Sequence, residues 1–176
     1  MIFEIDEIPE EGLGFDLFAN KEQFKIDQPD CCLAENVKIK GRLTRIDKEV
    51  FFAGELETLV QVTCTRCLKS FSLQIKNKIQ VHFVPQVKDP LSGSEVELKE
   101  TDIEKEVYHE GRINLRGPVR DQVLLDLPLI RLCHKGCKGI CPVCGNDFNA
   151  KQCECRNEEE IDPRLAVLKN LKDKLK

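Results

Sequence analysis

Apolar and polar residues alternate with a period of two in three runs within residues 37–83, the pattern of β-strands that bury one face and expose the other. In the first run, from Val37 to Thr44, the polar positions are mostly lysine and arginine. The apolar face of the second run comprises Phe52, Gly54, Leu56, Thr58, Val60, Val62 and Cys64. The third run begins at Phe71 and ends at Phe83. Because only short connections separate the runs, they predict an antiparallel meander.

Helical periodicity follows the strand pattern. Apolar residues recur four positions apart from Leu115 to Leu127, with Asn114 as a suitable N-cap and Pro128 as the residue that ends the run. A second helix is expected over 162–171, where leucines are spaced three apart after an Asp-Pro start. The expected fold class is therefore α+β, an antiparallel meander sheet packed with one or two helices and followed by a zinc-knuckle C-terminal segment.

Composition divides the chain into three parts. Residues 1–35 form an acidic N-terminal segment, residues 36–128 the core of antiparallel sheet plus helix, and residues 129–176 a cysteine-rich zinc-binding segment with the C-terminal helix. Within the core, proline, serine, glycine and acidic residues over 84–111 predict a solvated loop.

Positive charge is concentrated in two stretches of a chain whose net charge is −4. Residues 36–82 carry nine bases and four acids, and residues 111–176 carry thirteen bases and nine acids. These basic stretches are either ordinary solvated faces or surfaces that meet phosphate. The candidate nucleic-acid contacts are Lys38, Lys40, Arg42, Arg66, Lys69, Lys76, Lys78, Arg131, Lys135 and Lys138.

The expected compartment is the cytoplasm. No apolar run approaches the roughly 20 residues that span a bilayer, and the acidic start lacks the basic region of a signal peptide. Thiols stay reduced in the cytosol, so ten cysteines in such a chain indicate metal binding more readily than disulfides. Cys31 and Cys32 belong to no ligand motif and are expected to behave as small hydrophobic residues.

Eight of the ten cysteines occur in four short pairs. The pairs are Cys64/Cys67, Cys133/Cys137, Cys141/Cys144 and Cys153/Cys155. The sequence Cys-Pro-Val-Cys-Gly over 141–145 has the spacing of a zinc knuckle, since two thiolates two residues apart can reach one tetrahedral ion. The glycine that follows permits the positive φ that such a turn requires.

Two zinc ions, each bound by two pairs, would use all eight cysteines. The pairs 141/144 and 153/155 are near enough in sequence to close one compact site, which leaves 64/67 at a hairpin turn to join 133/137. The alternative is a single zinc held by four of the six C-terminal cysteines, and His134 is a further possible ligand. We therefore expect one or two Zn²⁺ per chain.

Catalysis is not expected. All-thiolate zinc sites are closed and structural, whereas catalytic zinc keeps an open water position. Cys64 and Cys67 have the spacing of a redox pair, but such a pair sits at a helix N-terminus, and this one lies between two predicted strands. The chain also lacks the glycine-rich phosphate loop, the nucleophile elbow and the zinc-protease motif.

Four stretches of the chain resemble the YceD family, the large ribosomal RNA subunit accumulation proteins of bacteria and plastids. They are V-T-C-T-R-C-L at 62–68, L-D-L-P-L-I-R-L-C at 125–133, C-K-G-I-C-P-V-C-G-N-D-F-N at 137–149 with C-E-C at 153–155, and D-P-R-L-A-V-L at 162–168. The resemblance implies a cytosolic, non-enzymatic factor needed for the synthesis, processing or stability of 23S ribosomal RNA.

Two classes of function remain open at this stage. In the first, the protein contacts large-subunit ribosomal RNA or its precursor directly. In the second, it is a protein-binding adaptor or assembly chaperone for a ribosomal protein or an RNA-processing enzyme. Neither class requires a membrane or a small-molecule substrate.

Overall fold

The computed structural model describes residues 1–86 and 105–155 of the chain. Its contacts divide the chain into two compact units. Of the described residues, the first unit contains 1–65, 69–86 and 105–133, and the second contains 66–68 and 134–155.

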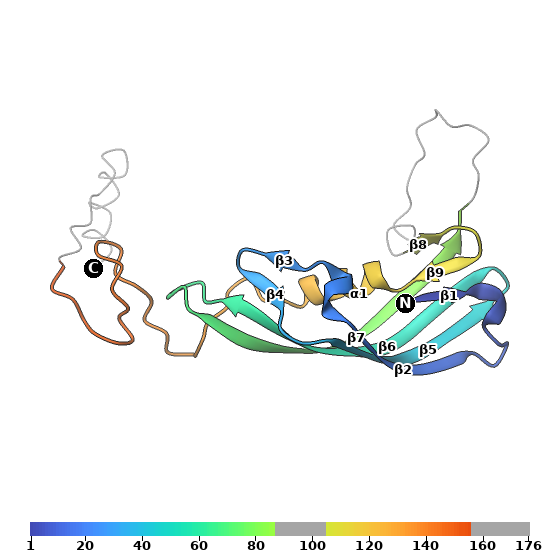
Figure 1. Ribbon diagram of the computed structural model, residues 1–176, viewed down its shortest axis with the longest axis horizontal. Coiled ribbons are helices and arrows are strands. Elements are labelled where there is room, and N and C mark those ends of the chain that lie inside the picture. The colour runs from blue at the N-terminus through green and yellow to red at the C-terminus, as the bar shows by residue number, and fades with distance from the viewer. Residues whose placement is uncertain (87–104, 156–176) are drawn as a thin grey trace, which may run out of the picture. The chain divides into compact units, whose positions relative to one another are not determined.

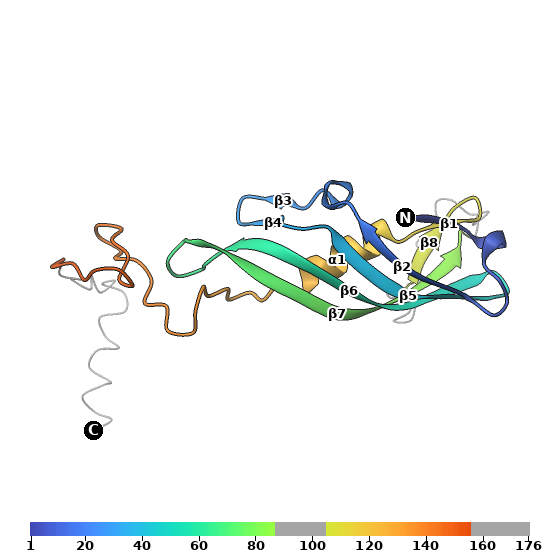
Figure 2. The same ribbon diagram turned by 60° about the horizontal axis from the view of Figure 1, so that its bottom comes forward.

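A mixed sheet of seven strands forms most of the first unit (Figure 1). Its strands are β2 (Leu13–Ala19), β3 (Asp27–Gln28), β4 (Cys31–Leu33), β5 (Val37–Ile46), β6 (Glu49–Thr63), β7 (Ser70–Pro85) and β8 (Lys105–Tyr108). The order is β2-β5-β6-β4-β3, with β7 paired to β6 and β8 paired to β7. All neighbours are antiparallel except β7 and β8, which run parallel. The long strands β5, β6 and β7 lie side by side in Figure 2.

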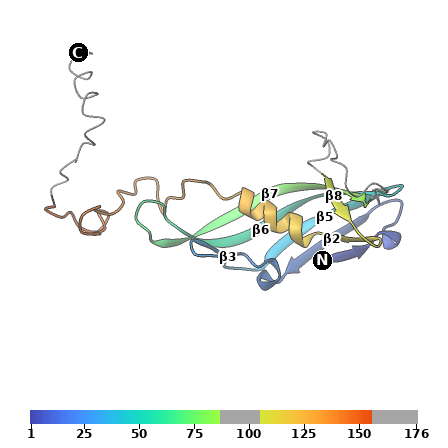
Figure 3. The same ribbon diagram turned by 90° about the horizontal axis from the view of Figure 1, so that it is seen from above.

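Smaller elements complete this unit. The strands β1 (Ile2–Glu4) and β9 (Arg112–Asn114) form a separate two-stranded sheet. Two short 3-10 helices, η1 (Ile5–Glu7) and η2 (Lys21–Phe24), flank β2. The helix α1 (Arg116–Leu125) lies across one face of the large sheet (Figure 3).

The hydrophobic core lies between α1 and the sheet, where the sequence alternation places it. Phe52, Leu56, Val60 and Val62 of β6 are almost fully buried, as the period-two pattern predicts. The helix contributes Val119 and Val123 to the same core, because residues four apart share one helical face. Core packing thus fixes which face of β5, β6 and β7 remains exposed.

The predicted meander and helix are confirmed, and with them the α+β fold class. The strands β5, β6 and β7 form the meander, and α1 occupies 116–125 within the predicted apolar run. Asn114 accepts a hydrogen bond from the backbone N–H of Arg116 through Oδ1, at 3.0 Å, at the start of the helix. Of the two expected helices, the one over 162–171 lies outside the described residues.

Two stretches contribute more strands than the sequence indicated. The first 35 residues supply β1 to β4, of which three strands belong to the large sheet, so this acidic segment is integral to the core unit. Part of the stretch expected to be a loop over 84–111 forms β8, and residues 112–114 form β9. These strands are short, and each is specified by pairing with a distant partner more than by its own pattern.

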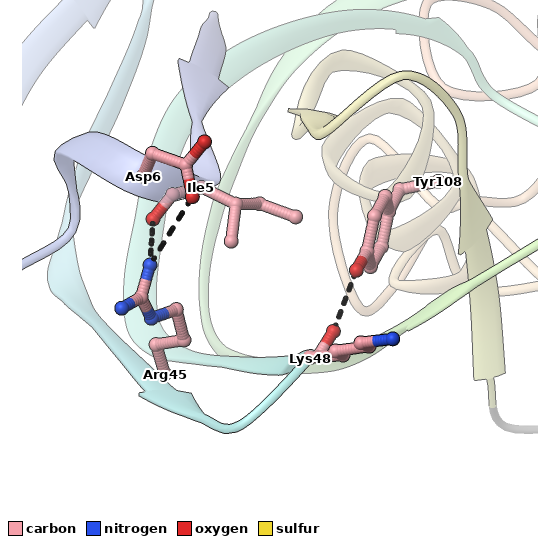
Figure 4. Close-up of polar contacts among 5 residues, drawn as sticks. All are labelled: Ile5, Asp6, Arg45, Lys48 and Tyr108. Carbon is pink, nitrogen blue, oxygen red and sulfur yellow. Dashed lines mark hydrogen bonds and ion pairs between the residues drawn. The ribbon is translucent and has the colours of Figure 1, made fainter.

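The turn between β5 and β6 is held at both sides by polar contacts (Figure 4). The Nη1 atom of Arg45 donates to the carbonyl of Ile5 at 3.0 Å and lies 3.6 Å from the carboxylate of Asp6. The hydroxyl of Tyr108 donates to the carbonyl of Lys48 at 2.7 Å. The strand β8 and the helix η1 are therefore tied to the same end of the meander.

Candidate metal centres

The eight paired cysteines gather into two groups of four in the described part of the chain. One group contains Cys64, Cys67, Cys133 and Cys137, and the other contains Cys141, Cys144, Cys153 and Cys155. Within each group the four sulfur atoms all lie within 4.8 Å of one another. The grouping is the one that the two-zinc hypothesis requires. The single-ion alternative leaves Cys64 and Cys67 outside the site, and nothing in this arrangement favours it.

Backbone hydrogen bonds shape the turn that carries the first pair. The N–H of Cys64 donates to the carbonyl of Lys69 at 2.9 Å, which closes the hairpin between β6 and β7. Leu68 has φ +59°, so the turn uses a left-handed residue that is not glycine. Thr65 donates to the carbonyl of Arg131 through its N–H at 2.8 Å and through its hydroxyl at 3.1 Å. Cys133, two residues after Arg131, is thereby brought to the hairpin.

Arg66 and Gly139 fix the chain around Cys137. The guanidinium of Arg66 donates to the carbonyl of Cys137 at 3.0 Å through Nη1. Gly139 has φ +82°, and a Cβ atom there would lie 3.2 Å from the carbonyl oxygen of Arg66. Glycine at 139 therefore meets two demands, a left-handed backbone and a close approach to another backbone.

The second group has the local geometry of a knuckle. Gly145, with φ +72°, donates its N–H to the carbonyl of Cys141 at 2.8 Å. Hydrogen bonds from the backbone N–H groups of Cys144 and Val143 both lower the pKa of Cys141. The N–H of Cys144 is the main cause that lowers the pKa of Cys141 to about 7. Donors arranged this way stabilise a thiolate, the form that binds metal.

The other thiols of this group hold their protons more strongly. A hydrogen bond with the sulfur of Cys144 is the main cause that raises the pKa of Cys155 to about 12. The backbone N–H of Cys155 lowers the pKa of Cys153, but hydrogen bonds with the sulfurs of Cys141 and Cys144, together with burial, outweigh it, so that pKa is also raised. When four adjacent sulfur atoms are not all thiolates, they share the remaining protons through hydrogen bonds. A multivalent cation bound among the sulfurs would replace those protons, so the site favours such a cation.

Both groups pass a test of fit to a tetrahedral ion. Zinc bound to four thiolates at about 2.3 Å requires sulfur atoms about 3.8 Å apart, and those of each group are already within 4.8 Å. Cys64, Cys67, Cys137 and Cys141 are buried, which suits structural thiolate sites. Both cysteine groups could therefore hold a metal ion.

Three residues considered beside these pairs lie in neither group. His134 is not among the grouped ligand atoms of the described residues. Cys31 is buried in β4, where burial is the main cause that raises the pKa of its thiol. Cys32 is half-buried on the same short strand. The two adjacent cysteines thus occupy sheet positions, as expected of small hydrophobic residues.

The strand lysines proposed as phosphate contacts have acidic neighbours across the sheet. In the register of β5, β6 and β7, Glu55 lies between Lys40 and Lys78. Glu57 lies in the same way between Lys38 and Lys76, and it also accepts a hydrogen bond from Gln74 at 2.9 Å. Opposite charges directly across a sheet attract each other, which reduces the potential that these lysines offer to a phosphate. Arg42, the fifth strand cation, is exposed opposite Ala53.

The cations near the cysteines differ in how they are used. Arg66 holds the carbonyl of Cys137, and Arg131 forms an ion pair with Asp30 while its side chain is only 16% exposed. Lys69, Lys135 and Lys138 are exposed residues. Sequence position alone did not distinguish these roles, because the partners Asp30 and Cys137 lie 101 and 71 residues away from their arginines.

Asn149 is a residue beside the cysteines that sequence reasoning did not single out. Its Nδ2 atom donates to the sulfur of Cys137 at 3.5 Å, and its Oδ1 atom accepts from the N–H of Lys138 at 2.8 Å. The stretch N-D-F-N at 146–149 offered a signal, since asparagine and aspartate commonly make such local side-chain bonds.

Among the described helices, none is both long and apolar enough to cross a membrane.

Comparison with known proteins places this arrangement in a family. Residues 52–172, more than half of the chain, match the family described as "Large ribosomal RNA subunit accumulation protein YceD". This span contains both cysteine groups. No solved structure matches the chain.

Similar proteins occur in bacteria and in a plant. The uncharacterized protein YlbN of Bacillus subtilis is 23% identical over 171 residues, which cover 97% of this chain and 94% of that protein. The uncharacterized protein Rv2926c of Mycobacterium tuberculosis is 28% identical over 127 residues, 72% of this chain and 58% of its own length. The chloroplastic "Large ribosomal RNA subunit accumulation protein YCED homolog 1" of Arabidopsis thaliana is 24% identical over 169 residues, 85% of this chain and 51% of its own length.

The match therefore extends beyond one cysteine motif. It includes strands of the meander, α1 and both cysteine groups, although the chain spans only 58% of the length of the mycobacterial relative. The chain belongs to the YceD family of large ribosomal RNA subunit accumulation proteins.

Proposed function

We propose that this protein is a non-enzymatic, zinc-binding factor that supports the synthesis, processing or stability of 23S ribosomal RNA during biogenesis of the large ribosomal subunit. The observation that carries the proposal is the family match over a span that contains both four-cysteine groups. The name of the Arabidopsis relative supports the same process. The proposed site of action is the cytoplasm, with no membrane and no small-molecule substrate involved.

Zinc is the proposed metal at both groups. When bound, it would supply structural cross-linking, because four thiolates leave no open position for water or substrate. Cys64, Cys67, Cys133 and Cys137 would hold one ion, and the remaining four grouped cysteines would hold the other. The protein's own contribution is to orient these ligands, through donors such as the N–H of Cys144 for Cys141 and the side chain of Asn149 for Cys137.

Direct contact with 23S ribosomal RNA or its precursor is the first proposed mode of action. The cations best suited to it are Lys69, Lys135 and Lys138, which are exposed near the cysteines and do not alternate with glutamates on adjacent strands. Phosphate contacts of this kind give binding that weakens steeply with salt.

An adaptor for a ribosomal protein or an RNA-processing enzyme is the second candidate. Three apolar residues that follow one another closely favour it: Leu125, Leu129 and Ile130 are 79%, 96% and 71% exposed. Where exposed apolar side chains form one contiguous patch, that patch is typical of a surface that binds another protein. The glutamates between the strand lysines point in the same direction, since they weaken that face as a phosphate surface.

Depletion of the protein tests the common proposal. We expect the ratio of 23S to 16S ribosomal RNA to fall and precursors of the large subunit to accumulate, and the protein to sediment with those precursors in a gradient. An unchanged ratio after complete depletion would contradict the role in ribosomal RNA. Nuclease treatment then separates the two modes: a stable protein complex that survives it supports the adaptor, and salt-dependent binding of purified protein to RNA supports direct contact.

A further inference from the structure

The segment N-D-F-N, residues 146–149, contacts the chain beside both cysteine groups. The N–H of Cys141 donates to the carbonyl of Asn146 at 2.8 Å, and the N–H of Phe148 donates to the carbonyl of Gly139 at 3.0 Å. Ile140 and Asp147 form a β-bridge between these two contacts. The segment therefore pairs with residues 139–141, which connect Cys137 of one group to Cys141 of the other.

The side chain of Asn149 extends this contact to a metal ligand. Its Nδ2 atom donates to the sulfur of Cys137 at 3.5 Å, which is an ordinary distance for a hydrogen bond to sulfur. Its Oδ1 atom accepts from the N–H of Lys138, the next residue, at 2.8 Å. One amide thus holds both the sulfur of Cys137 and the backbone that follows it.

The orientation of that amide is set within the knuckle loop. A carboxylate oxygen of Asp147 accepts from the backbone N–H of Asn149 at 2.9 Å and from its Nδ2 at 2.7 Å. The carbonyl of Asp147 accepts from the N–H groups of Ala150 and Lys151, each at 3.0 Å. These bonds form a compact turn in the loop between Cys144 and Cys153, both of which belong to the second group.

A donor to a ligating sulfur affects how tightly the metal is held. The hydrogen bond stabilises the thiolate and fixes the direction of the sulfur, and loss of such an outer contact costs about 10- to 100-fold in metal affinity. The Asn149 donor is correctly placed only while the 144–153 loop keeps its turn. Binding of an ion by the knuckle cysteines closes that loop at both ends.

We propose that Asn149 is a positioning residue that couples the two metal centres. Loading of the group that contains Cys141 orders the 146–149 segment, directs the amide of Asn149 at Cys137, and so strengthens metal binding by the group that contains Cys137. The inference rests on the zinc binding proposed above, and it adds a dependence of one site on the other.

The test uses the full chain and measures the affinity of the Cys137 group for Zn²⁺ by competition with a chromophoric chelator. Asn149→Asp is the informative change, because aspartate keeps the oxygen that accepts from Lys138 but has no N–H for the sulfur. We expect it to weaken this group about 10- to 100-fold. If Asn149 only held the backbone of Lys138, the Cys137 group of the Asn149→Asp chain would bind Zn²⁺ with the wild-type affinity. That result would overturn the proposal. Asn149→Ala removes the donor without adding charge, and carries the same test if Asn149→Asp does not fold.

Gln152→Glu is the matched control. It makes the same change from amide to carboxylate at an exposed residue of the same loop, and Gln152 makes no hydrogen bond to Cys137 among the described contacts. We expect its Cys137 group to bind Zn²⁺ within about twofold of the wild-type affinity, since an added charge in the loop is screened by solvent. An equal loss in Gln152→Glu and Asn149→Asp would assign the effect to charge alone and overturn the proposal.

Coupling is measured by a double-mutant cycle. Cys144→Ser disables the knuckle group, and we expect it to lower the affinity of the Cys137 group about tenfold or more in an otherwise wild-type chain. In the Asn149→Asp chain the same change is expected to have little further effect. Equal effects of Cys144→Ser in both backgrounds would overturn the coupling. Wild-type protein that binds neither Zn²⁺ nor Co²⁺ would instead contradict the proposed zinc binding itself, so the two failures are distinguishable.

Discussion

Gly41 of β5 lies directly opposite Gly54 of β6 in the antiparallel register. A Cβ atom on Gly54 would lie 2.6 Å from the carbonyl oxygen of Lys40, and one on Gly41 would lie 2.6 Å from the ring of Phe52. The absence of both side chains leaves room for Phe52, whose ring stacks on Phe15 with centroids 5.5 Å apart. This glycine pair therefore permits the aromatic part of the core.

We predict that Gly54→Ala destabilises the protein by about 1–3 kcal/mol, because the added methyl group meets backbone that cannot move independently. Urea unfolding monitored by circular dichroism measures the change. Gly14→Ala is the control, since Gly14 lies in β2 of the same sheet and an added Cβ there would come no closer than 4.0 Å to the nearest atom beyond its chain neighbours, the carbonyl oxygen of Gly41. That change should stabilise the protein by about 0.5–1 kcal/mol. Equal unfolding free energies for Gly54→Ala and the wild type would show that the sheet adjusts without cost.

Much of the sheet was predictable because side-chain alternation is a local property. The residues that the pattern assigns to the apolar face, from Phe52 of β6 to Cys64 just after it, are all buried except Gly54, which is half-buried. The pairing of β2 with β5 and of β8 with β7 was not predictable in the same way. Which distant strand occupies an edge depends on contacts across the whole sheet, and a short strand carries little pattern of its own.

The cysteine groups were predictable to a similar extent, and for a different reason. Short spacing identifies the pairs, and the use of every pair leaves few ways to combine them. The charged surface was less predictable, since alternation reports the face of a residue but not its cross-strand neighbour. Lys40 and Lys78 share an outer face as expected, yet Glu55 between them appears only in the register.

Two Zn²⁺ per chain are expected in protein purified without chelator. Cys67→Ser and Cys144→Ser should each lower the content to about one, because each removes a ligand from a different group, and the double variant should hold none. Elemental analysis of the purified variants measures this content. Cys32→Ser, outside both groups, is the control and should retain two.

The pairing within the first group has its own test. Cys67→Ser and Cys133→Ser are expected to destabilise the protein by similar amounts, and the double change should cost little more than either one, since both remove the same site. Zinc content and stability unchanged in Cys67→Ser would assign the metal to the six downstream cysteines alone. Thermal unfolding of the three variants at equal zinc concentration provides the comparison.

Replacing lysine by glutamine should distinguish lysines that contact RNA phosphates from lysines whose charge is offset by a neighbouring glutamate. If the protein binds RNA directly, changing Lys135 and Lys138 together to glutamine should weaken binding and reduce the slope of log K against log salt by about 1.4–1.8, the value for two lost phosphate contacts. The matched pair Lys40 and Lys78, changed in the same way, should have a smaller effect because Glu55 lies between them. Filter binding to a 23S fragment over a range of salt measures both slopes. An equal reduction for the two pairs would show that the glutamate does not shield the strand lysines.

Zinc binding by the knuckle group should release more protons as the pH falls from 8 to 6. Metal binds thiolates, so every ligand still protonated in the free protein must lose a proton on binding. The raised pKa values of Cys153 and Cys155 keep both thiols protonated throughout this range, so their contribution is constant. Cys141, with its pKa lowered to about 7 chiefly by the N–H of Cys144, is mostly thiolate at pH 8 and mostly thiol at pH 6. Its titration alone therefore adds about one released proton as the pH falls.

The same linkage fixes the sign of the affinity change. Because protons compete with the metal, the affinity should fall as the pH is lowered, and more steeply below pH 7, where Cys141 also has to be deprotonated. Calorimetric titration of a Cys67→Ser chain, in buffers of different ionisation enthalpy, isolates the knuckle group and counts the protons directly. Proton release that stays constant between pH 8 and pH 6 would show that the thiol of Cys141 does not titrate in this range, and that the N–H of Cys144 does not stabilise its thiolate as the geometry requires.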